Sequence, residues 1–130
     1  MANKFKIAQD ATFKTAVDIP RVGGTFIRVE FEFKYRDRKE LAVLFASWQE
    51  RVKADQSRFE AQGESLTLID ITDAHIDRQI EQVTELVAGW EFSSKVSPES
   101  IRELVETSAG AADAIVDAYQ KAYVPARLGN

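Results

Sequence analysis

The sequence predicts an α+β fold in which an N-terminal antiparallel β-hairpin packs on a mainly helical C-terminal part of about four helices. Two observations predict it: apolar side chains recur at every second position up to residue 36, and at every third or fourth position after residue 37. The 130 residues contain no repeat or long linker, and a chain of this size buries about two thirds of its surface on folding. We therefore expect a single domain over residues 1–130.

The hairpin is predicted from two segments, 13–19 and 27–36, in which apolar and polar side chains alternate. In the second segment five apolar side chains face one way and five charged side chains face the other, as in a strand with one buried face. Gly23 and Gly24 between the segments provide the backbone freedom of a tight turn. The short segment Lys4–Ala8 also alternates, and a third strand there is an open alternative.

Helical spacing begins after Asp37. Asp37 and Glu40 have the spacing of a capping box, and the apolar positions that follow predict a helix of about 22 residues that ends before Gly63. The next segment, Ser65–Ile71, is compatible with a short strand or with a buried connection, and the sequence leaves both open.

Further helices are predicted in the last third of the chain and just before it. One starts at Asp73, or at Thr72, and its apolar stripe runs to Trp90. The segment Ser97–Glu99 combines an N-cap, a proline at the first helical position and an acid that favours the helix dipole. A last helix over Ala111–Tyr123 follows a glycine and is ended by a proline. Its inward side chains are expected to be Ile115, Tyr119 and Ala122.

Composition excludes several function classes. With 17 basic and 21 acidic residues the net charge is −4, which argues against a nucleic-acid-binding protein. Cysteine is absent and His75 is the single histidine, which excludes disulfides, thiol catalysis and multi-histidine metal sites. The longest apolar run, Leu41–Ala46, is far shorter than the roughly 20 residues of a membrane span. We expect a cytoplasmic protein without a membrane segment.

No group of residues has the pattern of a catalytic, cofactor or metal site. Glu30 and Glu32 alternate with basic residues on the wet face of a strand, so they lack the environment that separates the pKa values of an acid/base pair. His75 lies near Asp73 and Asp77, whose spacing does not match a calcium loop and whose charges favour a helix start. We expect no enzymatic activity, no cofactor and no metal.

Aromatic side chains remain as candidates for a partner surface. Core packing accounts for most of them, and those near helix ends are left to contact another protein. The candidate interface residues are Trp90, Phe92, Tyr119 and Tyr123. The free edges of a short sheet offer a second route, because they can accept a strand from a neighbouring copy, so a homo-oligomer is expected.

Four segments near the C-terminus carry a family resemblance. Gly89–Phe92, Ser97–Ile101, Ala114–Ala122 and Ala126–Asn130, in this order, resemble the C-terminal part of tail assembly chaperones from long, flexible-tailed bacteriophages and prophages. The segment Thr107–Gly110 departs from the more helical or proline-containing junction of that family. The last two helices can therefore pack differently here.

The resemblance implies a non-enzymatic role in virion assembly. Proteins of this kind coat the long tape-measure protein, keep it soluble, and are absent from the mature virion. A longer form made by ribosomal frameshifting is thought to recruit tail-tube protein, and this chain is similar to the shorter form. The alternatives are a structural virion component, such as a tail-tube or head–tail joining protein, and a small-molecule-binding regulator or enzyme.

Overall fold

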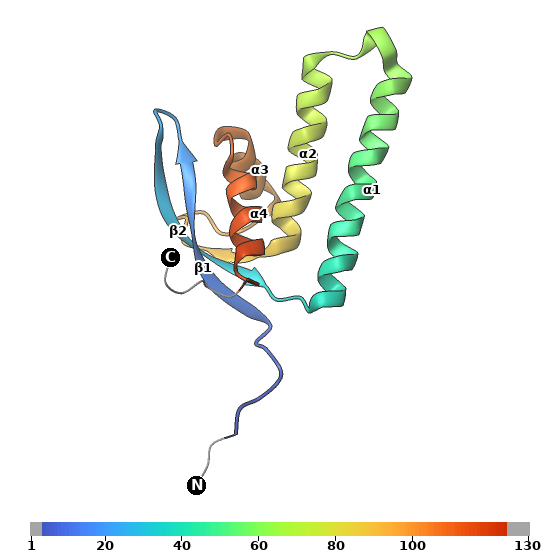
Figure 1. Ribbon diagram of the computed structural model, residues 1–130. Coiled ribbons are helices and arrows are strands. Elements are labelled where there is room, and N and C mark those ends of the chain that lie inside the picture. Colours follow the sequence, from blue (N-terminus) through green and yellow to red (C-terminus); the bar gives the residue numbers. More distant parts are fainter. Residues whose placement is uncertain (1–3, 125–130) are drawn as a thin grey trace, which may run out of the picture.

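The computed structural model describes residues 4–124 and has an α+β architecture, as predicted. A three-stranded antiparallel sheet forms one side of the molecule, and the two longest helices project from it as a helical hairpin (Figure 1). The outermost helix packs on its neighbour, which in turn contacts the two short helices. The elements are β1 (Thr12–Arg21), β2 (Thr25–Lys34), α1 (Arg38–Gln62), the 3₁₀ turn η1 (Gly63–Ser65), α2 (Leu68–Leu86), β3 (Val87–Trp90), α3 (Pro98–Thr107) and α4 (Ala111–Lys121).

The hairpin of β1 and β2 has the register that the alternation predicts. Val17 lies opposite Val29, and both are buried. The connecting glycines, Gly23 and Gly24, have φ values of 98° and 80°, which residues other than glycine rarely adopt. The buried face of the sheet therefore points toward the helices and the charged face toward solvent.

The third strand of the sheet is Val87–Trp90, not Lys4–Ala8. Lys4–Ala8 forms no strand and is exposed, whereas β3 pairs with β2 on its other side. The sequence analysis placed Val87–Trp90 in the second long helix because Val87 and Trp90 continue its apolar spacing. The extended backbone prevails because it pairs with the open edge of β2, and Val-Ala-Gly-Trp contains a β-branched residue and a glycine, which weaken a helix.

Three helices begin with reciprocal capping boxes. The boxes of α1 and α3 confirm the predicted starts at Asp37 and Ser97. The start of α2 was predicted wrongly: its N-cap is Thr67, which pairs with Asp70, so Leu68–Ile71 is the first turn of the helix. The segment Ser65–Ile71 is therefore neither a strand nor a buried connection. The helix α4 ends two residues before Tyr123, and Ala122, expected to point inward, is exposed. The predicted stop at Pro125 and the tail Ala126–Asn130 lie outside the described residues.

The core lies between the inner face of the sheet, the C-terminal end of α2, and the short helices. Its largest fully buried side chains are aromatic and branched aliphatic, and they come from β1, β2, α2 and α4. Ile115 and Tyr119 confirm the predicted inner face of α4. The fully buried side chains, by volume, are Tyr119, Phe31, Phe33, Ile19, Leu86, Ile115, Val17 and Val83.

Candidate partner-binding surfaces

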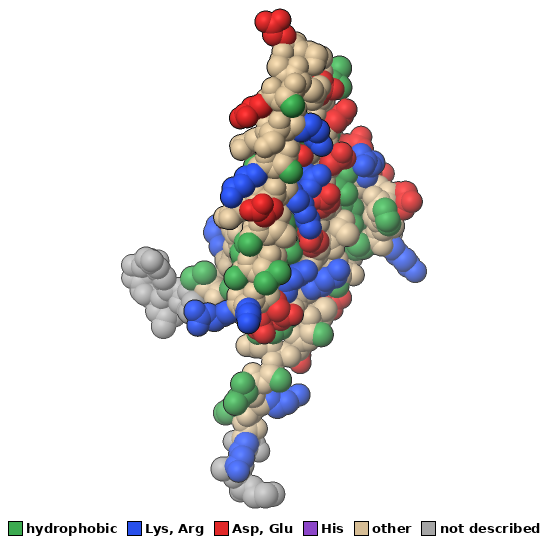
Figure 2. All heavy atoms as spheres, turned by 90° about the vertical axis from the view of Figure 1, so that its right-hand side faces the viewer, with side chains coloured by type: hydrophobic (Ala, Val, Ile, Leu, Met, Phe, Trp, Pro, Cys, Tyr) green, Lys and Arg blue, Asp and Glu red, His purple; other side chains and the backbone are tan. Residues whose placement is uncertain are grey.

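A ladder of ion pairs joins α1 to α2. Arg51 Nη1 lies 2.8 Å from Glu85 Oε1 and 3.2 Å from Glu81 Oε2. One turn further out, Arg78 lies 2.7 Å from Glu81 and 3.1 Å from the buried Asp55. Figure 2, which faces this side of the molecule, shows acidic and basic side chains alternating along the hairpin. Ion pairs therefore connect the outer half of α1 to α2.

Glu85 is the rung of this ladder that lies nearest the sheet. Burial raises the pKa of its carboxyl, but hydrogen bonds from Arg51 and from Trp48 Nε1, which lies 2.9 Å from Glu85 Oε1, lower it by more. The net effect is a pKa below the ordinary value of a glutamate. Glu85 therefore stays ionised at neutral pH and keeps both donors in place.

An apolar groove runs along α1 on the side that faces α4. Its inner hollow, of about 460 Å³, is lined by Phe45, Trp48 and Val52 of α1, with Gln120 of α4 opposite. A second hollow of about 300 Å³ shares Val52 and continues outward between α1 and α2 to Phe59, where charged side chains also line it. We call the two hollows together the arm groove. The other side chains that line it are Gln49, Lys53, Asp55, Gln56, Ile71, Ala74, His75, Arg78, Gln79, Gln82 and Asp113.

Apolar surface also remains exposed at the outer end of the hairpin. Leu68 and Ile69 in the first turn of α2 are 78% and 71% exposed, and Ile71, which lines the arm groove, is 41% exposed. Neighbouring apolar side chains on a protruding tip are a feature of surfaces that bind other proteins. The tip therefore continues the apolar path of the groove.

Trp90 and Phe92, two of the predicted interface residues, lie together next to the end of β3. Their rings meet edge to face at 5.2 Å, and both pack against Phe31, at 5.8 and 6.1 Å. Trp90 Nε1 donates a hydrogen bond of 2.6 Å to the carbonyl oxygen of Ser94. Both rings are half-buried, so each has one face on the core and some surface left to solvent.

A row of aromatic rings runs along the sheet from Phe92 through Phe31 and Phe33 to Tyr119. Tyr119 and Tyr123, the other two predicted residues, lie at the end of this row opposite Trp90 and Phe92. Tyr119 is fully buried, and its hydroxyl donates to the carbonyl oxygen of Lys34 at 2.8 Å. The Tyr123 hydroxyl donates to that of Tyr119 at 3.1 Å and accepts from the backbone N–H of Arg36 at 2.9 Å. Burial and the hydrogen bond with Tyr119 raise the pKa of Tyr123 well above its ordinary value. The Tyr123 phenol is thus neutral, and the two hydroxyls connect the C-terminal end of α4 to Lys34 and Arg36.

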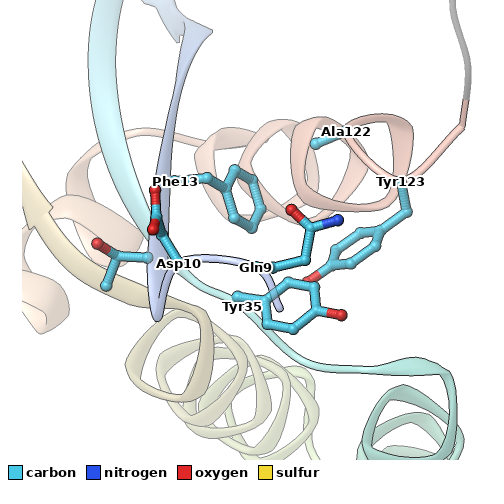
Figure 3. Close-up of a pocket in the computed structure, with 7 residues that line it drawn as sticks. Gln9, Asp10, Phe13, Tyr35, Ala122 and Tyr123 are labelled. Carbon is cyan, nitrogen blue, oxygen red and sulfur yellow. The ribbon is translucent and has the colours of Figure 1, made fainter. Parts of the chain in front are cut away.

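A cleft of about 350 Å³ opens beside these tyrosines (Figure 3). The rings of Phe13, Tyr35 and Tyr123 line it, with Gln9 and Asp10 at its edge. The rings contact one another at centroid distances of 5.7 and 6.1 Å, so the cleft is a gap in an aromatic cluster. Its polar lining consists of Gln9, Asp10 and Thr12, and the Thr12 hydroxyl donates to Glu32 Oε2 at 2.9 Å.

A comparison with protein families decides the class of this molecule. A family model described as phage tail assembly chaperone matches residues 1–130, the whole chain. The chain belongs to the phage tail assembly chaperone family. No curated protein and no solved structure matches it.

For a tail assembly chaperone the surfaces that matter are those that can hold another chain. The structure does not bring the four predicted residues into one site: Trp90 and Phe92 lie at one end of the aromatic row, and the tyrosines at the other. The role of these residues in binding a partner stays a prediction. Tyr119 has no surface of its own in the isolated chain and would act through Tyr123.

Sequence reasoning missed the arm groove. Phe45, Trp48 and Val52 have the spacing of a core-facing stripe, and the structure confirms this for Trp48, which is buried in the core, and for Phe45, which packs against it, whereas Val52 is 45% exposed. The available signal was Val43, an apolar residue on the opposite side of the same helix, because a helix with apolar residues on two sides exposes one of them.

Residues 4–124 were also compared with the requirements of a metal site and of a membrane-spanning helix. Within residues 4–124, no three histidine, cysteine, aspartate or glutamate side chains are grouped to hold a metal ion, and His75 lies exposed on α2. None of the helices there has the length and apolar character needed to cross a bilayer.

Proposed function

We propose that this tail assembly chaperone binds apolar helical segments of the phage tape-measure protein in the arm groove and keeps them soluble until the tail tube forms. The observation that carries the proposal is an apolar groove open to solvent along a helix of 25 residues, in a protein of this family. The action is reversible binding, without a bond made or broken.

The shape of the groove suits an amphipathic helix. Phe45, Val52 and Phe59 follow one another at intervals of seven residues, so they form one stripe along α1 that extends about 21 Å. A helix laid along this stripe would place its own apolar residues between these side chains, as in other helix-in-groove complexes. The amide side chains beside the stripe can hydrogen-bond with many polar partners, which favours tolerance of different helix sequences.

The proposal includes a place and a time of action. The chaperone works in the host cytoplasm, on tape-measure protein that has just been made, and leaves before the virion is complete. In a longer frameshifted form, the added domain would recruit tail-tube protein while residues 1–130 hold the tape-measure chain.

Co-expression with the tape-measure protein of the same phage tests the groove. We expect Val52→Glu to reduce the soluble fraction of the tape-measure protein severalfold, because the carboxylate would lie in the apolar stripe. Val43→Glu is the matched control: Val43 is exposed on the same helix, about 180° around it from Val52. Equal loss with both variants, or with neither, would contradict binding in the arm groove.

The analysis of purified virions separates this function from that of a structural component. A chaperone should be present in infected cells and missing from finished tails when both are analysed by mass spectrometry. Detection of the protein in stoichiometric amounts in the virion would favour a tail-tube or head–tail joining protein.

A further inference from the structure

The outer edge of the sheet is built to accept another strand. β1 is an edge strand of ten residues. The carbonyl oxygen of Ala11 accepts from the N–H of Tyr35, and the register then makes the odd-numbered residues of β1 bond to β2. The backbone groups of Lys14, Ala16 and Asp18 therefore point outward. Within the described residues, no strand pairs with this edge.

A hollow lies directly beside this edge. Its volume is about 420 Å³, and it is bounded by Thr15–Asp18 of β1 and by one face of α4. That face consists of Ala114, Ala118 and Ala122, spaced four residues apart, with the ion pair of Asp117 and Lys121, at 2.9 Å, next to it. Small side chains on the helix leave room for large side chains of a strand added along β1. A strand between a sheet edge and a helix is a known mode of peptide binding.

The chain also carries a strand-like segment that pairs with nothing in the structure. Lys4–Ala8 projects from the body of the molecule (Figure 1), with a bend at Ile7 and Ala8, and Phe5 and Ile7 are 95% and 100% exposed. Lys4 and Lys6 alternate with these apolar residues. In a strand, the two apolar side chains would share one face and the two lysines the other.

We propose that Lys4–Ala8 of one copy of this protein adds as a strand to the free edge of β1 in a second copy. Phe5 and Ile7 then fill the hollow under the alanine face of α4. Lys4 and Lys6 lie on the solvent side of the sheet, where Asp18 is the acidic side chain of β1. The site is distinct from the arm groove, so the association does not depend on binding of the tape-measure protein.

A second copy is favoured over the segment's own chain for a geometric reason. Because Ala11 is already fixed to Tyr35, only Gln9 and Asp10 could reverse the chain. A two-residue turn that matches strand twist needs a positive φ at its first residue, which here would be Gln9, a residue type that rarely adopts it. It would also place Ile7 opposite Thr12 and Phe5 opposite Lys14, on the charged face of the sheet. A strand from another copy can choose the register that turns both side chains inward.

The first test measures self-association of the full chain by sedimentation. We expect a concentration-dependent dimer or larger species that Ile7→Asp weakens at least about tenfold, because a carboxylate would enter the apolar hollow. Ala16→Pro should weaken it similarly, since it removes an N–H that faces outward and leaves the bonds to β2 intact. Val43→Asp is the control and should associate like the wild type. A wild type that stays monomeric at high concentration, or an Ile7→Asp variant that associates equally well, would overturn the proposal.

The second test identifies the site. The chain has no cysteine, so a mixture of Ile7→Cys and Ala118→Cys chains can be treated with a short bis-maleimide. We expect a cross-linked dimer in this mixture, and several times less in a mixture of Ile7→Cys with Val43→Cys. Cross-linking that occurs only within single chains carrying both Ile7→Cys and Ala118→Cys would show that the segment folds back on its own sheet, and would refute exchange between copies.

Discussion

The helices α1 and α4 use their side chains in different ways. α4 buries Ala111, Ala112, Ile115 and Tyr119 within 11 residues, whereas α1 buries only Leu44, Trp48 and Asp55 within 25. One of these three is a carboxylate held by two arginines. α4 is therefore part of the core, and α1 is a helix with spare surface, attached by charges. In this tail assembly chaperone, the longest helix is the one that contributes least to the core.

The largest effect is expected in α4. Ile115→Ala should lower the free energy of unfolding by about 2–5 kcal/mol, because it leaves a cavity among fully buried side chains. Urea denaturation followed by circular dichroism would measure the change. A loss below about 1 kcal/mol would show that α4 is not part of the core in the way the structure describes.

The next effect concerns the charged attachment of α1. Asp55→Ala leaves Arg78 and Arg58 without their shared partner and should cost about 1–3 kcal/mol. Amide hydrogen exchange should quicken in the outer half of α1 while α4 stays protected. Equal acceleration in both helices would mean that the hairpin and the core unfold as one unit.

A smaller effect should depend on pH. The pKa of Glu85 is lower in the folded protein than its ordinary value of 4.5, so its contribution to stability is present above that value and is lost as the pH falls through the folded-state pKa. Glu85→Gln should therefore be less stable than the wild type at pH 7, by up to about 1 kcal/mol. The difference should shrink at pH 3. Denaturation curves at both pH values would test this, and a constant difference would contradict it.

The smallest effect is expected on the surface of α1. Val52→Ala should change the free energy of unfolding by no more than about 0.5 kcal/mol, because Val52 is already 45% exposed. The same denaturation measurement applies. A loss as large as that of Ile115→Ala would remove the contrast between the two helices.

The local features of the fold could be predicted from the sequence. The alternation in 27–36 gives the buried face of β2, and the capping residues Asp37 and Ser97 give two helix starts. Each signal is complete within a few residues. The capping box of Thr67 and Asp70 is equally local, but the apolar run around it resembled a strand or buried connection and hid the helix start.

The features that depend on distant partners could not be predicted. Val87–Trp90 becomes a strand because β2 has an open edge beside it, which the helical spacing of those residues does not reveal. The arm groove exists because Gln120 and Asp113 of α4 come to lie opposite Val52. Tyr119 was predicted both on the inner face of its helix and near a partner surface; its burial against Phe13 and Phe33 confirms the first of these predictions.

The order of the strands has a consequence for the size of the projecting hairpin. β2 and β3 are neighbours in the sheet, and the whole of α1 and α2 is inserted between them in the sequence. Seven extra residues in each helix would lengthen the hairpin by about 10.5 Å, with almost the same sides facing each other and no change in strand register. Insertions can thus change how far the α1–α2 hairpin projects while the sheet is preserved.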